Sequence, residues 1–222
     1  MQIEEISINN KEYPEQLRNI YDPPKKIYVL GNKEILKQNG IAIVGSRNAT
    51  EYGKKVAFKI SKELSENGIN IISGLAIGID TYAHLGNLQA QLKLDSNVGK
   101  TIAVLGSGID EIYPEKNRNL AIKIIKTGGC IVSEYPIGTK IERKNFPERN
   151  RIISGLSKGV LIVEAAEKSG SLITAEFALE EGKEVFAIPG SIFSKTSIGT
   201  NKLINDGAKV VISSQDIIEE II

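Results

Sequence analysis

The chain has 222 residues, 41% of them hydrophobic, and carries 28 basic and 27 acidic side chains for a formal net charge of +1. This length predicts one large α/β domain with a sizeable core, and the charge balance excludes a general polycation, so any nucleic acid must meet a local patch. Because Cys130 is the single cysteine, a disulfide framework and a cysteine-based metal site are excluded. The first residues lack the basic and apolar regions of a signal peptide, and no apolar run reaches the length of a membrane span. We therefore expect a cytoplasmic protein without a membrane partner.

The first 40 residues show no sustained period and are punctuated by prolines, including Pro14, Pro23 and Pro24. They predict a short helix at 15–20 and a strand at 27–30. This segment is too short for a domain of its own, so we expect a lead-in over residues 1–40 packed on a core domain over residues 41–222.

From residue 41 onward, short apolar runs alternate with longer segments of helical period. The expected strands are residues 41–45, 69–74, 101–106, 130–133, 160–164, 184–189 and 209–213. The expected helices are residues 51–67, 78–91, 114–126, 171–181, 200–206 and 214–221. Runs that are apolar at every position are typical of parallel strands covered on both faces. The pattern predicts an α/β fold, a doubly wound, mostly parallel Rossmann-like sheet of about seven strands with helices on both faces.

Five of the predicted strands end in turns rich in small residues: G-S-R-N-A-T, S-G-L-A-I-G-I-D, L-G-S-G-I-D, E-A-A-E-K-S-G-S and P-G-S. In an open α/β sheet such turns meet at the carboxyl edge, where ligands bind and helix N-termini attract anions. One such turn can simply allow a tight connection, but five together predict a ligand with phosphates. Arg47, in the first turn, can donate two hydrogen bonds to one phosphate. The absence of G-x-G-x-x-G and of an acid after the second strand disfavours a dinucleotide cofactor, and no P-loop occurs.

A basic stretch follows the fourth predicted strand. From Lys140 to Lys158, six cations stand against two acids, Glu142 and Glu148, with Phe146 among them; the cations are Lys140, Arg143, Lys144, Arg149, Arg151 and Lys158. Cations that neutralise phosphates beside a ring that stacks an unpaired base are what single-stranded nucleic acid requires. The alternative is a solvated loop and helix face whose phenylalanine turns inward, because charge runs are usually surface.

Eight short motifs occur in order along the chain: G-S-R at 45–47, S-G-L-A-I-G-I-D-T-Y-A-H at 73–84, T-I-A-V-L-G-S-G-I-D-E-I-Y-P at 101–114, S-E-Y-P-I-G-T at 133–139, F-P-E-R-N-R-I-I-S-G-L-S at 146–157, E-A-A-E-K-S-G-S-L-I-T-A at 164–175, I-P-G-S at 188–191 and G-T-N-K-L-I at 199–204. Each is weak alone. Together they resemble the DNA-processing protein A family, also called DprA or Smf, from about Tyr13 to the end, in its Rossmann-like core only.

The resemblance implies a dimeric protein that binds single-stranded DNA, protects incoming DNA in natural transformation and loads the recombinase RecA. It implies no catalytic residue, no cofactor and no metal. Carried over position by position, the resemblance implies that the glycine-rich turns bind phosphates of the strand. Ser46 and Arg47 would bind one backbone phosphate, and Phe146 would stack on a base. The implied DNA-binding residues are Gly45, Ser46, Arg47, Ser73, Gly74, Gly78, Gly106, Gly108, Arg143, Lys144, Phe146, Arg149, Asn150, Arg151, Ser169, Gly170 and Ser171. For the dimer contact we expect the apolar C-terminal residues Ile217, Ile218, Ile221 and Ile222.

Some features stay open. The segment 85–100 is longer than the family pattern and is expected to extend a helix or loop beside the groove. Asp80 is expected to order its turn at a helix N-terminus rather than act as a base. Two other functions compete: a sensor of a small nucleotide, and a nucleoside-monophosphate hydrolase of the lysine-decarboxylase-like group. That group's P-G-G-x-G-T loop is not matched, although Glu176 follows the corresponding turn. Six cations with an aromatic exceed what one nucleotide needs and favour a polymer.

Overall fold

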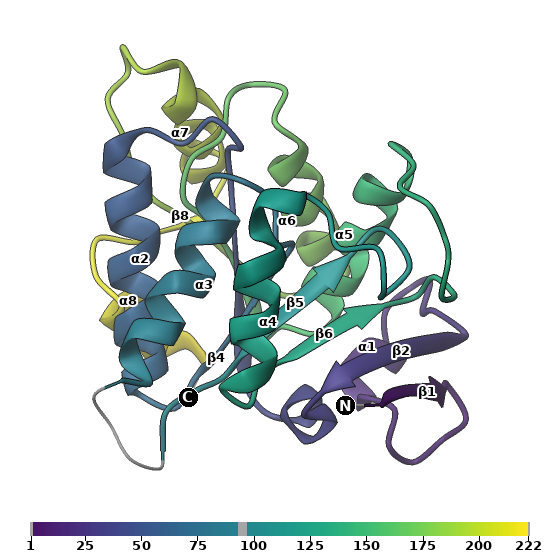
Figure 1. Cartoon of the computed structure of the whole chain (residues 1–222). Coiled ribbons are helices and arrows are strands. Elements are labelled where there is room, and N and C mark those ends of the chain that lie inside the picture. The colour runs from purple at the N-terminus through teal and green to yellow at the C-terminus, as the bar shows by residue number, and fades with distance from the viewer. Residues whose placement is uncertain (1, 93–96, 222) are drawn as a thin grey trace.

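A computed structural model describes residues 2–92 and 97–221, and its described strands form one nine-stranded sheet (Figure 1). Across the sheet the strand order is β1-β2-β6-β5-β4-β3-β7-β8-β9. The strands are β1 (Ile3–Ser7), β2 (Lys26–Gly31), β3 (Gly40–Val44), β4 (Asn70–Ser73), β5 (Thr101–Leu105), β6 (Cys130–Ser133), β7 (Gly159–Ile162), β8 (Glu184–Ala187) and β9 (Lys209–Val210).

The seven strands from β3 to β9 are parallel, as the apolar runs predicted. Their registers pair Ile41 with Ile71 and Leu161 with Phe186, and β3 to β7 are buried at every position. A strand that is covered on both faces has no polar alternation, which is why these runs are continuous. The predicted fold class is confirmed.

The first 40 residues add two antiparallel strands to the same sheet. β2, which was expected at 27–30, pairs with β6 with Tyr28 opposite Ser133, and β1 pairs with β2. The sheet therefore has nine described strands instead of about seven. β1 was not expected because I-E-E-I-S has neither a continuous apolar run nor strict alternation; it is an edge strand whose partner makes it a strand.

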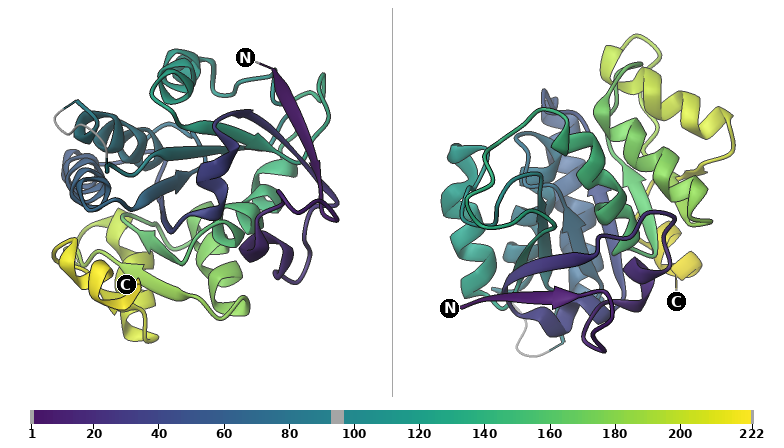
Figure 2. Two further views of the ribbon diagram at one scale, coloured as in Figure 1. Left: turned by 90° about the horizontal axis from the view of Figure 1, so that it is seen from below. Right: turned by 90° about the vertical axis from the view of Figure 1, so that its right-hand side faces the viewer.

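Helices cover both faces of the sheet (Figure 2). On one face lie α2, α3, α4 and α8, and on the other α1, α5, α6 and α7. Their bounds are α1 (Glu15–Arg18), α2 (Glu51–Glu66), α3 (Ile79–Ala90), α4 (Arg118–Lys126), α5 (Asn145–Gly155), α6 (Gly170–Glu180), α7 (Ile198–Asn205) and α8 (Gln215–Ile221), with 3-10 turns η1 (Lys33–Lys37), η2 (Glu115–Asn117) and η3 (Lys195–Ser197).

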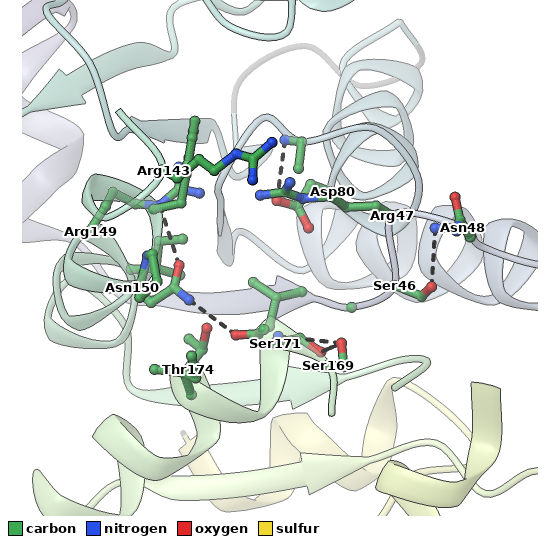
Figure 3. A pocket seen from close by; sticks show the side chains of 18 of the residues that line it. Ser46, Arg47, Asn48, Asp80, Arg143, Arg149, Asn150, Ser169, Ser171 and Thr174 are labelled. Atoms are coloured by element: carbon green, nitrogen blue, oxygen red, sulfur yellow. Dashed lines mark hydrogen bonds between the residues drawn. The ribbon is translucent and has the colours of Figure 1, made fainter. Parts of the chain in front are cut away.

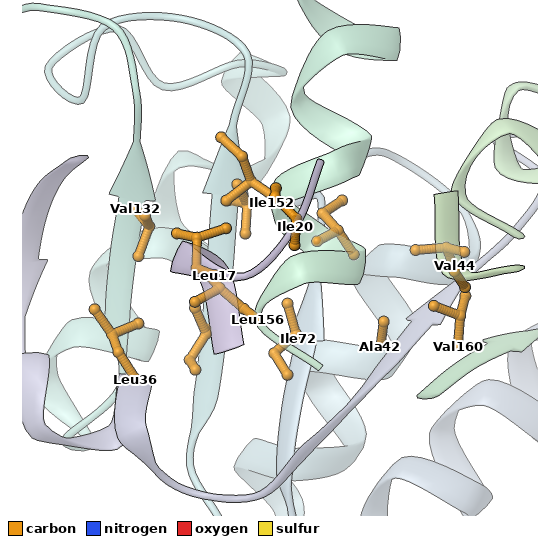
Figure 4. Close-up of a cluster of buried hydrophobic side chains, with 14 of the residues drawn as sticks. Leu17, Ile20, Leu36, Ala42, Val44, Ile72, Val132, Ile152, Leu156 and Val160 are labelled. Carbon is orange, nitrogen blue, oxygen red and sulfur yellow. The ribbon is translucent and has the colours of Figure 1, made fainter. Parts of the chain in front are cut away.

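The core beneath α5 is what positions the site. Ile152 and Leu156 of α5 pack with Leu17 of α1 over the sheet residues Ala42 and Ile72 (Figure 4). All five side chains are fully buried. Because these apolar residues hold α5 against the sheet, the first turn of the helix and the loop before it are fixed over the carboxyl ends of β3 and β5.

Two expectations about the C-terminal helix and the long insertion need correction. Ile217 is fully buried and Ile218 and Ile221 pack against the same core, so α8 uses its apolar face within its own chain; Ile222 lies outside the described residues. Residues 85–90 form the second half of α3, and the rest of the segment 85–100 leads to the start of β5, so its described parts run to the amino edge of the sheet, opposite the predicted groove. Residues 93–96 lie outside the described chain. Over the stretches described, no helix has the length and apolarity to cross a membrane.

Candidate functional site

A pocket of about 890 Å³ opens at the carboxyl edge of the sheet, where the turns after β3 and β7 meet the N-terminal half of α5 (Figure 3). Segments that lie far apart in the sequence therefore form one concave surface, to which the stretches after β4 and β5 add Ala76, Asp80 and Tyr113. The predicted DNA-binding residues that line it are Gly45, Ser46, Arg47, Arg143, Phe146, Arg149, Asn150, Ser169, Gly170 and Ser171.

Arg47 and Phe146 form the aromatic side of this pocket. The guanidinium carbon of Arg47 lies 5.4 Å from the ring centroid of Phe146, within the range of a cation–π contact. The ring of Tyr113 packs on Phe146 with centroids 5.6 Å apart and planes tilted by 44°. A cation is thus held next to an aromatic ring that is only half-buried, and both border open space.

Arg143 enters the pocket from the loop that connects β6 with α5. Its side chain is exposed, and it extends toward the same space as Arg47 from the other side (Figure 3). Its neighbour Lys144 points elsewhere, because its Nζ lies 2.9 Å from a carboxylate oxygen of Glu142. Of these two adjacent cations, the structure brings only Arg143 to the pocket.

Arg149 lies at the floor of the pocket with only 4% of its surface exposed. One of its terminal nitrogens donates to the carbonyl oxygen of Gly74 at 2.8 Å and also to that of Val104. Burial lowers the pKa of Arg149 to about 10, so the guanidinium remains charged at neutral pH. Its hydrogen bonds tie α5 to the turn after β4 and to β5 itself, and the guanidinium adds positive charge at the floor of the pocket.

Asp80, on the first turn of α3, is the acidic group of the pocket. Its Oδ2 accepts hydrogen bonds from the amides of Gly74 at 3.1 Å and Ala76 at 3.3 Å, so it orders its turn. Burial raises the pKa of Asp80 to about 6, and the positive charge of Arg149 opposes that rise. Oδ2 is thus bonded within its own turn, in line with the role expected from the sequence.

Two of the predicted glycines serve the packing of these turns. A Cβ on Gly74 would lie 2.6 Å from a terminal nitrogen of Arg149, so only glycine leaves room for the buried guanidinium. Gly78 has φ +85°, and a Cβ there would lie 2.3 Å from the carbonyl oxygen of Ser46. That close approach lets α3 start directly behind the turn that carries Arg47.

The turn after β7 brings the N-terminus of α6 into the pocket. Ser169 caps this helix, its Oγ accepting from the amide of Ser171 at 3.4 Å. The side-chain amide of Asn150 donates to the carbonyl oxygen of Gly170 at 3.2 Å and links α5 with α6. Amides at a helix N-terminus attract anions, so this wall complements the arginines opposite.

Several predicted residues lie away from the pocket. Ser73 is fully buried and its hydroxyl donates to the carbonyl oxygen of Ile43 at 2.7 Å. Arg151 pairs with both carboxylate oxygens of Glu134, at 2.7 and 2.6 Å, and with Asp22 of the lead-in at 3.1 Å. Gly106 lies behind Phe146, and the amide of Gly108 donates to Thr139 at 2.9 Å. The sequence does not show that Arg151 would pair with Glu134 and Asp22, because these residues meet only in the folded chain.

Several pocket residues were not assigned to DNA binding from the sequence, among them Tyr113, Asn48, Ile141, Thr174 and Asp80. Tyr113 and Asn48 follow strands β5 and β3 on the same sheet edge as the glycine turns. Extending the carboxyl-edge rule a few residues beyond each strand would have found both.

Two residues that hydrolytic chemistry could use, His84 and Glu164, take part in structural hydrogen bonds. His84 is fully buried, with Nδ1 2.7 Å from Thr101 Oγ1, and burial lowers its pKa to about 3. Glu164 accepts from the amide of Thr50 at 2.9 Å and contacts Thr196 Oγ1 at 3.2 Å. Over residues 2–92 and 97–221 no cluster of histidine, cysteine or acidic side chains is arranged to hold a metal ion.

A Rossmann-like sheet binds its ligands at the carboxyl ends of its strands, and in this chain an arginine-lined pocket lies at that edge. The chain matches the family described as DNA recombination-mediator protein A over residues 4–222. It is 47% identical to the DNA processing protein DprA of Bacillus subtilis (strain 168) over 220 residues, 99% of this chain and 71% of that protein. Protein Smf of Escherichia coli (strain K12) is 44% identical over 216 residues, 97% of this chain and 56% of that protein. The chain belongs to this family of DNA-processing proteins, which confirms the resemblance.

Solved structures agree with this assignment. The X-ray structure of DprA from Streptococcus pneumoniae superposes with a TM-score of 0.91 at 44% identity, covering 100% of this chain and 75% of that one. A structure of DNA processing protein A from Helicobacter pylori, which concerns its single-stranded DNA binding mode, has a TM-score of 0.84 at 32% identity and covers 99% and 95%. A molybdenum cofactor binding protein from Rippkaea orientalis shares the fold alone, with a TM-score of 0.56 at 19% identity.

Proposed function

We propose that the chain binds single-stranded DNA in the carboxyl-edge pocket. The observation that carries this proposal is the guanidinium of Arg47 placed 5.4 Å from the centroid of the Phe146 ring, with Arg143 facing the same space. A phosphate on the two arginines leaves the attached base within reach of the ring, which is the arrangement a single strand requires. The single-stranded DNA binding mode reported for the Helicobacter pylori relative supports the same assignment.

The charge of the pocket favours a polymer over a single nucleotide. Three guanidinium groups, of Arg47, Arg143 and Arg149, stand against one carboxylate, that of Asp80. The exposed loop before α5 also carries Lys140, the chain neighbour of the pocket residue Ile141. Successive phosphates of a strand would use this surplus, whereas one nucleoside monophosphate would leave most of it without a counter-charge.

Preference for single strands follows from the ring. Phe146 can stack only on a base whose face is free, and in a duplex both faces of each base are covered by its neighbours. Duplex DNA would still meet the arginines through its phosphates, so we expect weaker, salt-sensitive binding of duplex.

We further propose that this site binds without catalysis. Asp80 is held by two backbone amides, His84 is buried on Thr101, and Glu164 is bonded to Thr50. A nucleotide hydrolase would need one of these groups free to accept a proton beside the substrate. The competing hydrolase function keeps one supporting observation, the raised pKa of Asp80 at about 6 beside the pocket.

We also propose, from the family resemblance, that the chain forms a homodimer and loads the recombinase RecA onto the bound strand. For the dimer we take the exposed residues Val210 and Ile212 at the edge strand β9 as candidates, because α8 is packed on its own core and β9 has an edge that is unpaired in the described sheet. RecA loading is tested by the rate at which RecA begins DNA-dependent ATP hydrolysis on coated single strands with and without the protein.

The decisive experiment compares fluorescence anisotropy of a labelled oligo-dT and of the matching duplex, with nucleoside monophosphates as competitors. We expect tighter binding of the single strand and little competition by a monophosphate. In parallel, the purified chain is incubated with nucleoside monophosphates and the release of base or phosphate is followed. Turnover of a monophosphate, or equal affinity for single strand and duplex, would replace this proposal by one of the small-nucleotide functions.

A further inference from the structure

The loop between β8 and η3 displays two neighbouring apolar side chains to solvent. Ile192 is 81% exposed and Phe193 is 92% exposed. This loop begins at the carboxyl end of β8, the same edge of the sheet that carries the pocket. An exposed phenylalanine beside an exposed isoleucine is a feature that a folded chain usually avoids unless a ligand covers it.

The loop is held in place by hydrogen bonds on both sides of these residues. The side chain of Asn201 donates to the carbonyl oxygen of Gly190 at 2.9 Å and accepts from its amide at 3.1 Å. The amide of Ser194 closes a turn onto Ser191 at 3.0 Å, directly around Phe193. The ring is therefore presented by an ordered turn, and binding to it costs little additional conformational entropy.

The loop is continuous with the wall of the pocket. The carbonyl oxygen of Thr196 accepts from the amide of Ala165 at 2.7 Å, and the next residue, Ala166, lines the pocket. On the other side, the hydroxyl of Tyr52 donates to the carbonyl oxygen of Pro189 at 3.3 Å. β8 lies two strands from β3 in the sheet, about 10 Å at the usual strand spacing.

We propose that Phe193 is a second stacking position for the DNA strand that the pocket holds, reached after the strand crosses the turn between β7 and α6. This inference rests on the proposed function and adds the route that the DNA strand takes across the protein. Phe146 and Arg47 bind one nucleotide, and Phe193 stacks on a base further along the strand. The exposed cations Lys168 and Lys195 border this path and match the charge of the phosphates. About three nucleotides at the rise of B-form DNA span the distance between the roots of the two turns.

A length series separates the two stacking positions. Anisotropy is measured with oligo-dT of about two nucleotides, too short to reach from the pocket to Phe193, and of about sixteen nucleotides, the upper end of the site sizes of single-strand binding folds. Phe193→Ala is expected to weaken the long oligonucleotide by about 5- to 150-fold and to leave the short one unchanged, because the short one fills only the pocket. Phe146→Ala is expected to weaken both. Phe193→Trp, which keeps a ring, should restore binding of the long oligonucleotide.

The matched control is Tyr21→Ala, which removes an aromatic ring that is 98% exposed at the other end of the sheet and should change neither affinity. If Phe193→Ala binds both lengths like the unmodified chain while Phe146→Ala is weakened, the second position is refuted and the pocket stands. If the unmodified chain binds neither oligonucleotide, the proposed function fails and the inference fails with it. If Phe193→Ala converts a dimer to a monomer in light scattering and lowers both affinities equally, the ring is a contact between copies and the inference is wrong.

Discussion

The contact between Arg47 and Phe146 makes a quantitative prediction about DNA binding. Arg47→Ala removes one phosphate contact, so the slope of log affinity against log salt should flatten by about 0.7 for a single strand. The affinity at low salt should fall about tenfold, the value of a charge-assisted hydrogen bond of about 1.5 kcal/mol. Phe146→Ala removes stacking, which should cost about 1–3 kcal/mol and leave the slope nearly unchanged.

The two substitutions should not be additive. The guanidinium lies 5.4 Å from the ring centroid, so each side chain holds the other in its binding position. A cation–π contact contributes about 0.5–2 kcal/mol, and the double variant should therefore lose less affinity than the sum of the single losses by that amount. The assay is anisotropy of labelled oligo-dT from about 50 to 200 mM salt, a range over which phosphate contacts change affinity strongly.

Lys158→Ala is the control for this series, because it removes an exposed cation of the same basic stretch at the opposite edge of the sheet, just before β7. It should change neither the affinity nor the slope. Three results would refute the reasoning: an unchanged slope for Arg47→Ala, a slope for Phe146→Ala that flattens as much as that for Arg47→Ala, or strict additivity of the pair.

Three further predictions concern stability and assembly. Burial raises the pKa of Asp80 from 3.8 to about 6, so the neutral carboxyl stabilises the fold below pH 4, and the free energy of unfolding should fall by about 3 kcal/mol as the pH rises through 6. Asp80→Asn, whose amide oxygen can replace Oδ2, should not show this fall in urea unfolding. Parallel pH curves for the two proteins would contradict the prediction. Arg151→Met should lower the free energy of unfolding by about 3 kcal/mol, since it leaves Glu134 largely buried without its partner, yet keep the salt slope of DNA binding; a flattened slope would return Arg151 to the interface. Ile212→Glu should lower the mass of the protein in light scattering, because Ile212 is 79% exposed beside the edge strand β9; an unchanged dimer would require another surface.

Most of the fold and part of the site could be predicted from the sequence. The continuous apolar runs from residue 41 determine buried parallel strands, and a doubly wound sheet then brings their turns to one edge. That rule alone places Arg47 near Ser169, although more than a hundred residues separate them. The aromatic within the basic stretch was also a valid local signal, since Phe146 lines the pocket.

Which of the neighbouring cations faces the pocket was decided only by the tertiary structure. Arg143, Lys144, Arg149 and Arg151 look equivalent in the sequence, but the packing of Ile152 and Leu156 on the sheet sets the rotation of α5. That rotation turns Arg149 inward onto carbonyl oxygens 75 and 45 residues away and Arg151 toward Glu134 and the lead-in.

The burial of α8 and the formation of the strand β1 were also decided only by the tertiary structure. The apolar pattern around Ile217 is the same whether these residues pack on their own chain or on a second copy. Similarly, I-E-E-I-S forms a strand only because it pairs with the free edge of β2. Local pattern determines which segments can be buried. What each of them is buried against depends on contacts between distant residues, and those exist only once the whole sheet has assembled.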